Sequence, residues 1–232
     1  MLLLNFNQLS AQKNRQIFIN EFLASNITIN ADIVDFDDYS DWIELYNDEN
    51  VDVDIGDLFL TDDQDNPLRW EIPQGTMIEA KGFLRFWADG YDEVPGRTHQ
   101  RPYLNQNGQR DYFTTKYYHL NFKLSRAGEF IGLYRADGTA VDSVSYKLQM
   151  RDVSRGRQPD GSANWFYFGE PTPNGANITQ GTTSTQFSDN PVISLASGFY
   201  TGTQIVTLAS GSDAQIRYTL DGAKPTSDSS LY

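Results

Sequence analysis

The stretch Asp41-Trp42-Ile43-Glu44-Leu45-Tyr46-Asn47 is rich in aromatic and bulky aliphatic residues, which favour a pleated, half-buried β-strand. Similar short apolar runs recur on both sides of it. We expect further strands at residues 17–22, 57–60, 83–87, 120–124, 130–134, 141–146 and 165–168. Gly, Pro, Asn and Asp separate these runs, and no long stretch has the periodicity of a helix. The sequence therefore predicts an all-β fold, either a sandwich or a barrel.

One polar region interrupts this pattern. Residues 91–118 are rich in Arg, Gln, Asn and Tyr and lack clear alternation, so we expect a long insertion loop. Long loops on rigid scaffolds often bind ligands. The candidate ligand-binding residues are Tyr91, Arg97, Arg101, Tyr103, Arg110 and Tyr112. Tyrosine beside arginine suits an anionic or glycan ligand.

The charge of the chain is negative and unevenly distributed. The formal net charge is -13, which disfavours binding to nucleic acid because such affinity comes mainly from Lys and Arg. Residues 32–65 contain fourteen carboxylates and no Lys or Arg, whereas residues 101–157 contain ten Lys and Arg against five Asp and Glu. Nucleic-acid binding through this basic strip stays open as an alternative, although a solvated face is the simplest interpretation of each charge cluster.

Two aspartate-rich stretches are candidates for a calcium site. They comprise Asp35, Asp37, Asp38 and Asp41 in the first stretch, and Asp62, Asp63 and Asp65 in the second. Carboxylate oxygens at such close spacing can ligate Ca²⁺ from one loop. The order of an EF-hand is not met, because Gly and Glu are missing from the positions where that loop needs them. A solvated acidic loop is therefore the alternative interpretation, and no cofactor other than calcium is expected.

Several residue types and motifs that mark catalytic sites are missing from the sequence. There is no cysteine, which excludes a disulfide, a thiolate nucleophile and a Cys-ligated metal. The two histidines, His99 and His119, cannot form an HExxH motif. The chain also lacks a GxSxG elbow, a P-loop and kinase signatures, and its many acids single out no glycosidase pair. We therefore expect no catalytic activity.

The composition also predicts how the chain is divided. Residues 1–15 are expected to be a signal-peptide remnant or a disordered N-terminus, because a short apolar run ends there at small residues. Residues 16–178 form the expected sandwich, and residues 179–190 have the composition of a linker. Residues 191–232 supply too few strands to close a second sandwich, so a larger parent protein is expected. No segment is apolar over the length that a membrane span requires.

The order of these segments resembles the lamin-tail domain family. Residues 41–47 resemble the family's signature strand, residues 17–22 its opening strand and residues 57–62 its next one. Residues 70–75, 82–88, 121–125 and 128–142 follow in the family's order, and residues 156–173 resemble its closing segment. This resemblance implies an immunoglobulin-like β-sandwich of the lamin-tail type over residues 16–178.

The C-terminal part resembles a second family. Residues 199–202 and 216–226 are similar to the small β-domain, of immunoglobulin or fibronectin-III type, at the C-terminus of chitobiase and β-hexosaminidase. Together the two resemblances imply a secreted or cell-surface bacterial protein, in which such a module binds or positions an extracellular protein or glycan surface. The alternative is an accessory domain that orients an adjacent catalytic domain, either a spore-coat-H-type kinase or a secreted hydrolase.

Overall fold

The computed structural model describes residues 16–32, 38–91, 97–104, 109–184, 191–210, 215–222, 225 and 228–232, with the backbone alone over 97–104 and 110–116. It divides into two compact units at Thr183 and Ser184, which we call the sandwich unit and the small unit. All regular secondary structure of the described residues is β. No helix in this part of the chain has the length and apolarity needed to span a bilayer. The predicted all-β class is confirmed.

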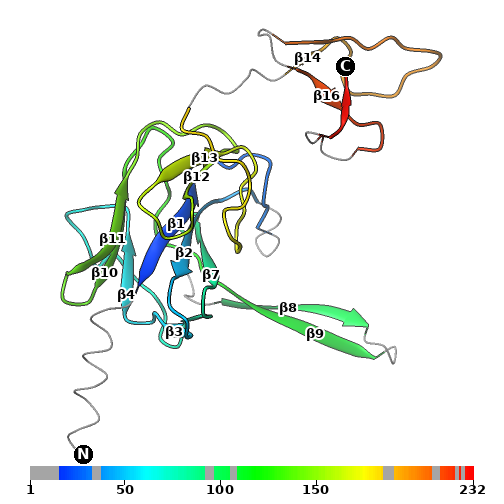
Figure 1. The fold of residues 1–232 in the computed structure, drawn as a ribbon. Helices are drawn as coiled ribbons and strands as arrows, with labels where there is room; N and C mark the ends of the chain where they lie inside the picture. Colours follow the sequence, from blue (N-terminus) through cyan, green and yellow to red (C-terminus); the bar gives the residue numbers. More distant parts are fainter. Residues whose placement is uncertain are drawn as a thin grey trace, which may run out of the picture. The chain divides into compact units, whose positions relative to one another are not determined.

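Two antiparallel sheets make up the sandwich unit (Figure 1). The larger sheet has the order β13-β12-β1-β2-β7 and the smaller one the order β11-β10-β4-β5. The larger sheet contains β1 (Ile17–Leu23), β2 (Asp41–Asn47), β7 (Phe83–Ala88), β12 (Ser154–Arg157) and β13 (Trp165–Phe168). The smaller sheet contains β4 (Leu58–Thr61), β5 (Trp70–Glu71), β10 (Phe130–Arg135) and β11 (Ala140–Ser145), while β3 (Val53–Asp54) pairs separately with β6 (Met77–Ile78).

The core lies between these two sheets. Ile43 and Leu45 of β2 are fully buried in it, as the alternation of the sequence predicts. Leu60 of β4 and Leu133 of β10 belong to the same cluster although they lie in the other sheet. Because both sheets contribute to one cluster, they pack face to face as a β-sandwich.

The outer face of the larger sheet is also covered. Trp42 of β2, whose side chain alternates with those of the core, packs with Leu23 and Trp87 in a second small cluster. Further along the same face, residues 158–182 form a closing segment, which includes the edge strand β13 and hydrogen-bonds to β1 and β2 through residues on either side of that strand. The sheet is therefore buried on both sides, which explains the nearly continuous burial of β1 and β2.

A β-bulge interrupts the pairing of β1 with β2. The register between β1 and β2 shifts between Ile19 and Glu21, which leaves Asn20 as the extra residue. Side chains then form the hydrogen bonds of the main-chain groups of Ile19. Its N–H donates to Asp142 Oδ2 at 2.8 Å, and its carbonyl accepts from Arg157 Nε at 2.8 Å. Arg157 also donates from Nη2 to both carboxylate oxygens of Asp142. One buried arginine thus joins β1, β11 and β12.

The prediction of a long irregular loop over residues 91–118 was wrong. Within it, β8 (Arg97–Leu104) pairs with β9 (Arg110–Tyr117) as an antiparallel hairpin whose strands join neither large sheet. The sequence signal for a strand is apolar alternation, which arises only where one face is buried. A hairpin of polar residues carries no such signal, although its backbone forms the same ladder.

The predicted strand at residues 120–124 was wrong for the opposite reason. Leu120, Phe122 and Leu124 alternate because they are buried in the core. The segment nevertheless forms no strand, and meets the end of β7 only through isolated bridges, Trp87 with His119 and Asp89 with Lys123. Alternating burial can thus arise without a regular ladder.

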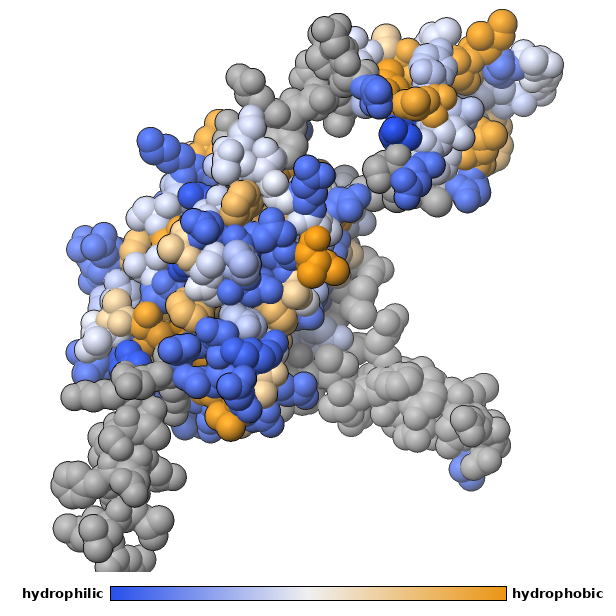
Figure 2. Space-filling model, in the orientation of Figure 1, coloured by the Kyte–Doolittle hydropathy of each residue, from blue (hydrophilic) through white to orange (hydrophobic). Residues whose placement is uncertain are grey.

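The small unit consists of two short ladders. β14 (Val192–Ile193) pairs with β15 (Leu208–Ala209), and β16 (Arg217–Tyr218) pairs with β17 (Ser230–Leu231). None of its described residues is buried, and several apolar side chains lie on its surface (Figure 2). A second β-structured region is therefore present, but its described part forms no core.

Candidate functional site

A hollow of about 460 Å³ lies at one edge of the sandwich unit. Four segments form it: the turn after β1, the start of β2, the end of β7, and residues 123–126. The structure brings three sequence-predicted residues together here, since Asp38, Asp41 and Tyr91 all line it. Its volume falls in the range of about 300–1,000 Å³ that is usual for small-molecule sites. We call it the Tyr39–Tyr91 hollow.

Asp41 and Asn26 form the fixed wall of this hollow. Asp41 Oδ1 accepts a hydrogen bond of 2.8 Å from the main-chain N–H of Asn26, and Asn26 Nδ2 donates to the carbonyl of Ser40 at 2.9 Å. Partial burial raises the pKa of Asp41 to about 6, and the negative charge of Glu129 adds to the rise. Asp41 therefore titrates near neutral pH, and its position is held by the turn after β1.

Two tyrosines stand at the hollow with their side chains partly in solvent. Tyr39 is 41% exposed and Tyr91 is 42% exposed. Each has its backbone held by the acid beside it in sequence: Tyr39 N–H donates to Asp38 Oδ1 at 2.8 Å, and Tyr91 N–H donates to Asp89 Oδ1 at 3.0 Å. The aspartates therefore fix the backbone at the two points where the tyrosines project.

A buried histidine supports one of these aspartates. His119 Nδ1 lies 2.6 Å from Asp89 Oδ2, and His119 Nε2 lies 3.5 Å from Asp32 Oδ2. Sequence reasoning missed this contact, because thirty residues separate Asp89 from His119 and no motif joins them. The isolated bridge between Trp87 and His119 brings them together.

Two cations complete the lining. Lys123 and Arg126 are exposed; Lys123 forms the isolated bridge with Asp89, and Arg126 follows three residues later. The stem of Lys123 lies against Gly90, where a Cβ would come within 3.2 Å of its Cε atom. Gly90 also has φ of +75°, which disfavours any other residue. The hollow thus offers hydrogen-bond donors on the cations Lys123 and Arg126 and acceptors on the aspartates.

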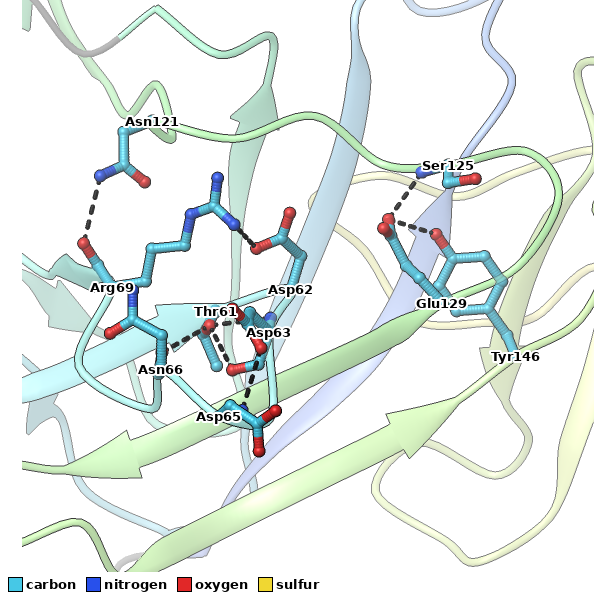
Figure 3. A network of polar contacts seen from close by, with 10 residues as sticks. All are labelled: Thr61, Asp62, Asp63, Asp65, Asn66, Arg69, Asn121, Ser125, Glu129 and Tyr146. Atoms are coloured by element: carbon cyan, nitrogen blue, oxygen red, sulfur yellow. Dashed lines mark hydrogen bonds and ion pairs between the residues drawn. The ribbon is translucent and has the colours of Figure 1, made fainter.

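The second aspartate-rich stretch builds a turn (Figure 3). Asp62 pairs with Arg69, while Asp63 Oδ1 accepts from the N–H of Asp65 at 2.9 Å. Thr61 Oγ1 donates within the same turn to the carbonyls of Asp63 and Asn66. The carboxylates of Asp62 and Asp63 are thus already used locally.

The first aspartate-rich stretch is described only in part. Asp35 and Asp37 lie outside the described residues, whereas Asp38 and Asp41 line the hollow. Among the residues that the structure describes, no three His, Asp or Glu side chains are grouped so that they could hold a metal ion. The calcium site stays a prediction.

The predicted hairpin residues are placed by their register alone. Arg97 lies opposite Tyr117, Arg101 opposite Phe113, and Tyr103 opposite Asp111. Tyr112 pairs with Pro102 and Arg110 with Leu104. The pairing brings these arginines and tyrosines onto two adjacent strands, as one contiguous ribbon.

A pair of buried glutamates lies at the centre of the larger sheet. Glu21 of β1 and Glu44 of β2 lie directly opposite each other, and both are fully buried. Burial raises the pKa of Glu21 to about 7, and burial together with the charge of Glu21 raises that of Glu44 well above its usual range.

The closing segment covers this glutamate pair. Thr172 donates to Glu21 from both its N–H and its hydroxyl group. The N–H of Asn174 donates to Glu44 Oε2 at 2.5 Å. The two acids thus have shifted pKa values, which often mark catalytic groups, yet Thr172 and Asn174 cover them and neither acid lines the Tyr39–Tyr91 hollow.

The basic strip of residues 101–157 is not one continuous surface. Arg157 is buried and is paired with Asp142 at 2.9 Å, and its guanidinium lies over the ring of Trp165. A phosphate contact needs an accessible cation, so this end of the strip lends no support to nucleic-acid binding.

Two antiparallel sheets packed face to face place the sandwich unit in the class of β-sandwich domains. Residues 10–148, more than half of the chain, match the lamin tail domain family, whose fold is immunoglobulin-like. The chain belongs to this family. Residues 195–232 match the chitobiase/beta-hexosaminidase C-terminal domain. No curated protein matches the chain.

Both predicted resemblances are therefore confirmed, in the predicted order. The family match ends at residue 148, before β12 and β13. The structure nevertheless pairs β12 with β1, so the closing strands belong to the same sheet as the matched region.

Proposed function

We propose that the chain is a non-catalytic binding and positioning module of a larger secreted or surface-attached protein, with an extracellular protein or glycan surface as its partner. Both matched families are β-domains, and their succession in one chain supports a multidomain arrangement. The Tyr39–Tyr91 hollow and the β8–β9 hairpin are the binding surfaces that this proposal names.

The hollow is the observation that carries the proposal. It gathers Tyr39, Tyr91, Lys123 and Arg126 around an opening at the edge of a rigid sandwich. Partly exposed aromatic side chains among polar groups are typical of recognition surfaces. The buried Glu21–Glu44 pair is covered by the closing segment, which favours binding over acid–base catalysis.

Binding arrays test this function. Purified chain is applied to an array of extracellular proteins and to an array of glycans, alongside a variant with Tyr39→Ala and Tyr91→Ala and a variant lacking residues 95–115. We expect the wild type to bind at least one array member and one of the two variants to lose that binding. Both changes are at the surface or in a separate hairpin, so the thermal unfolding of the sandwich should stay unchanged.

The matched control for this experiment is Leu148→Ala. Leu148 is exposed in the sandwich unit and does not line the hollow. It should bind as the wild type does. If the wild-type chain binds neither array, or if both variants bind as well as the control, the proposal is wrong.

The second candidate function is an accessory role beside a catalytic domain. The match of residues 195–232 to a domain found in chitobiase and beta-hexosaminidase favours it. The coding sequence of the parent protein decides between the two functions. A kinase or hydrolase domain in the same polypeptide would support the accessory role, and a polypeptide of binding modules alone would exclude it.

A further inference from the structure

We infer that the Tyr39–Tyr91 hollow binds a neutral, hydroxyl-rich sugar. This inference rests on the proposed binding function and names the class of ligand for the same site. It is carried by three features of the hollow: two partly exposed tyrosines, a lining of mixed charge, and a backbone that is held before any ligand arrives.

The tyrosines supply the apolar part of the recognition. Among the tyrosine side chains described in the sandwich unit, Tyr39 and Tyr91 are the exposed ones, whereas the others are buried or half-buried: Tyr46, Tyr118 and Tyr146 are buried, and Tyr117, Tyr134 and Tyr167 are half-buried. A tyrosine ring offers a rigid apolar face with a hydroxyl at its end. The C–H face of a pyranose ring has matching chemistry, since it is apolar on the face and polar at the edge.

The polar lining favours a ligand without net charge. An anionic ligand would lie beside Asp38, Asp41 and Asp89, and a cationic ligand would lie beside Lys123 and Arg126. Either ligand would place like charges together and desolvate them, which opposes binding. A sugar hydroxyl both donates and accepts, so it can bond carboxylates and cations in the same hollow.

The site is held in place by contacts beneath it. His119 lies against Asp89, and Asp89 accepts from the N–H of Tyr91. On the other side, Asn26 holds Asp41. Binding to such a surface orders few additional groups, which limits the entropic cost of association. We treat His119 as a positioning residue, because it acts on Tyr91 through Asp89.

The test is isothermal titration calorimetry, which measures the affinity of the full chain for neutral oligosaccharides. The probes are cellohexaose, xylohexaose, mannohexaose, maltohexaose and chitohexaose, with oligogalacturonate as the anionic probe and a chitosan hexamer as the cationic one. We expect at least one neutral probe to bind and the two charged probes to bind more weakly. Binding of neither neutral nor charged sugars, or preference for a charged one, would overturn the inference.

Matched variants locate the binding. Tyr39→Ala and Tyr91→Ala should each lower the affinity for the neutral probe about tenfold, which corresponds to the loss of one good stacking contact. Tyr39→Phe keeps the ring and should stay within about threefold of the wild type, and Leu148→Ala should not change the affinity. Equal affinities for all of these variants would place the sugar elsewhere and overturn the assignment.

Two further outcomes separate this inference from the proposed function. If the double variant with Tyr39→Ala and Tyr91→Ala loses binding to an extracellular protein while the wild type binds no sugar, only the ligand class is wrong. If the bound oligosaccharide is shortened, as chromatography of the mixture would show, the hollow is catalytic and the non-catalytic function itself is wrong.

Discussion

The sandwich unit and the small unit are both built from β-strands, yet only one of them has a core. Leu60, in the sandwich unit, is fully buried, whereas Leu220, in the small unit, is 94% exposed. The strands of the small unit are two residues long and form ladders of two. Isolated two-stranded ladders are marginal in water, because they bury too little apolar surface to offset chain entropy.

The difference shows where the stability of this chain resides. In the sandwich unit, strands distant in sequence share buried side chains and buried polar contacts. In the small unit, apolar side chains such as Ile193, Val206 and Leu208 surround an open groove. Strand formation and core formation are therefore separate properties, since residues 120–124 are in the core without a strand and the small unit has strands without a buried described residue.

Two arginines test this difference most strongly. Arg157→Ala removes the buried partner of Asp142 and the donor to the Ile19 carbonyl. We expect a loss of about 3–5 kcal/mol in the free energy of unfolding, because the change removes the cation that pairs with the half-buried Asp142 and leaves the Ile19 carbonyl without its donor. Urea unfolding followed by tryptophan fluorescence measures this loss, since all four tryptophans lie between residues 42 and 165.

Arg217→Ala is the control in the small unit. Arg217 donates from Nη1 to the carbonyl of Ser229 at 2.7 Å, in a region with no buried described residue. The unfolding of the sandwich should not change by more than about 0.5 kcal/mol in this variant. Similar losses of unfolding free energy in Arg157→Ala and Arg217→Ala would contradict the conclusion that only the sandwich unit depends on buried polar contacts.

A smaller effect is expected from two leucines. Leu60→Ala should destabilise the sandwich by about 2–5 kcal/mol, because it opens a cavity in the core. Leu220→Ala changes a side chain that is already in solvent, and should leave the same transition within about 0.5 kcal/mol. Thermal unfolding followed by fluorescence compares them directly. An equal fall in melting temperature would contradict the assignment of the core to the sandwich unit.

The sequence predicted the strands that carry the core. The apolar runs at residues 17–22, 83–87 and 130–134 became β1, β7 and β10, because burial of apolar side chains and strand formation coincide in them. It missed β12 (Ser154–Arg157), whose sequence contains two arginines and a glycine. Arg157 is buried by pairing with Asp142, and local sequence carries no signal of a partner from another strand.

The candidate site was predictable only in pieces. Tyr91, Asp38 and Asp41 were selected for separate reasons, as part of a binding loop and of a calcium stretch, and the fold places them around one hollow. Tyr39, Lys123 and His119 were not selected. The places of His119 and Lys123 depend on their bridges to the end of β7, and such long-range contacts leave no periodic pattern in the sequence.

The smallest expected effect concerns the glutamate pair beneath the closing segment. It is a pH dependence of the free energy of unfolding of the sandwich unit. The pKa of Glu21 is raised to about 7 by burial, while its usual value is 4.5. The folded state therefore holds a proton that the unfolded state releases. The stabilisation is complete below about pH 4.5 and is lost as the pH rises through about 7. The raised pKa of the facing Glu44 adds to the same trend.

We expect the free energy of unfolding to fall by about 1–3 kcal/mol between pH 5 and pH 8. Glu21→Gln mimics the protonated acid, so the variant should lose much of this slope and should be more stable than the wild type at pH 8. Glu71→Gln, at an exposed position of β5, should keep the wild-type slope. Urea unfolding at several pH values gives all three slopes. A wild-type slope in Glu21→Gln would contradict the assignment of the pH dependence to Glu21, because a group whose replacement leaves the slope intact cannot be the one that binds the proton.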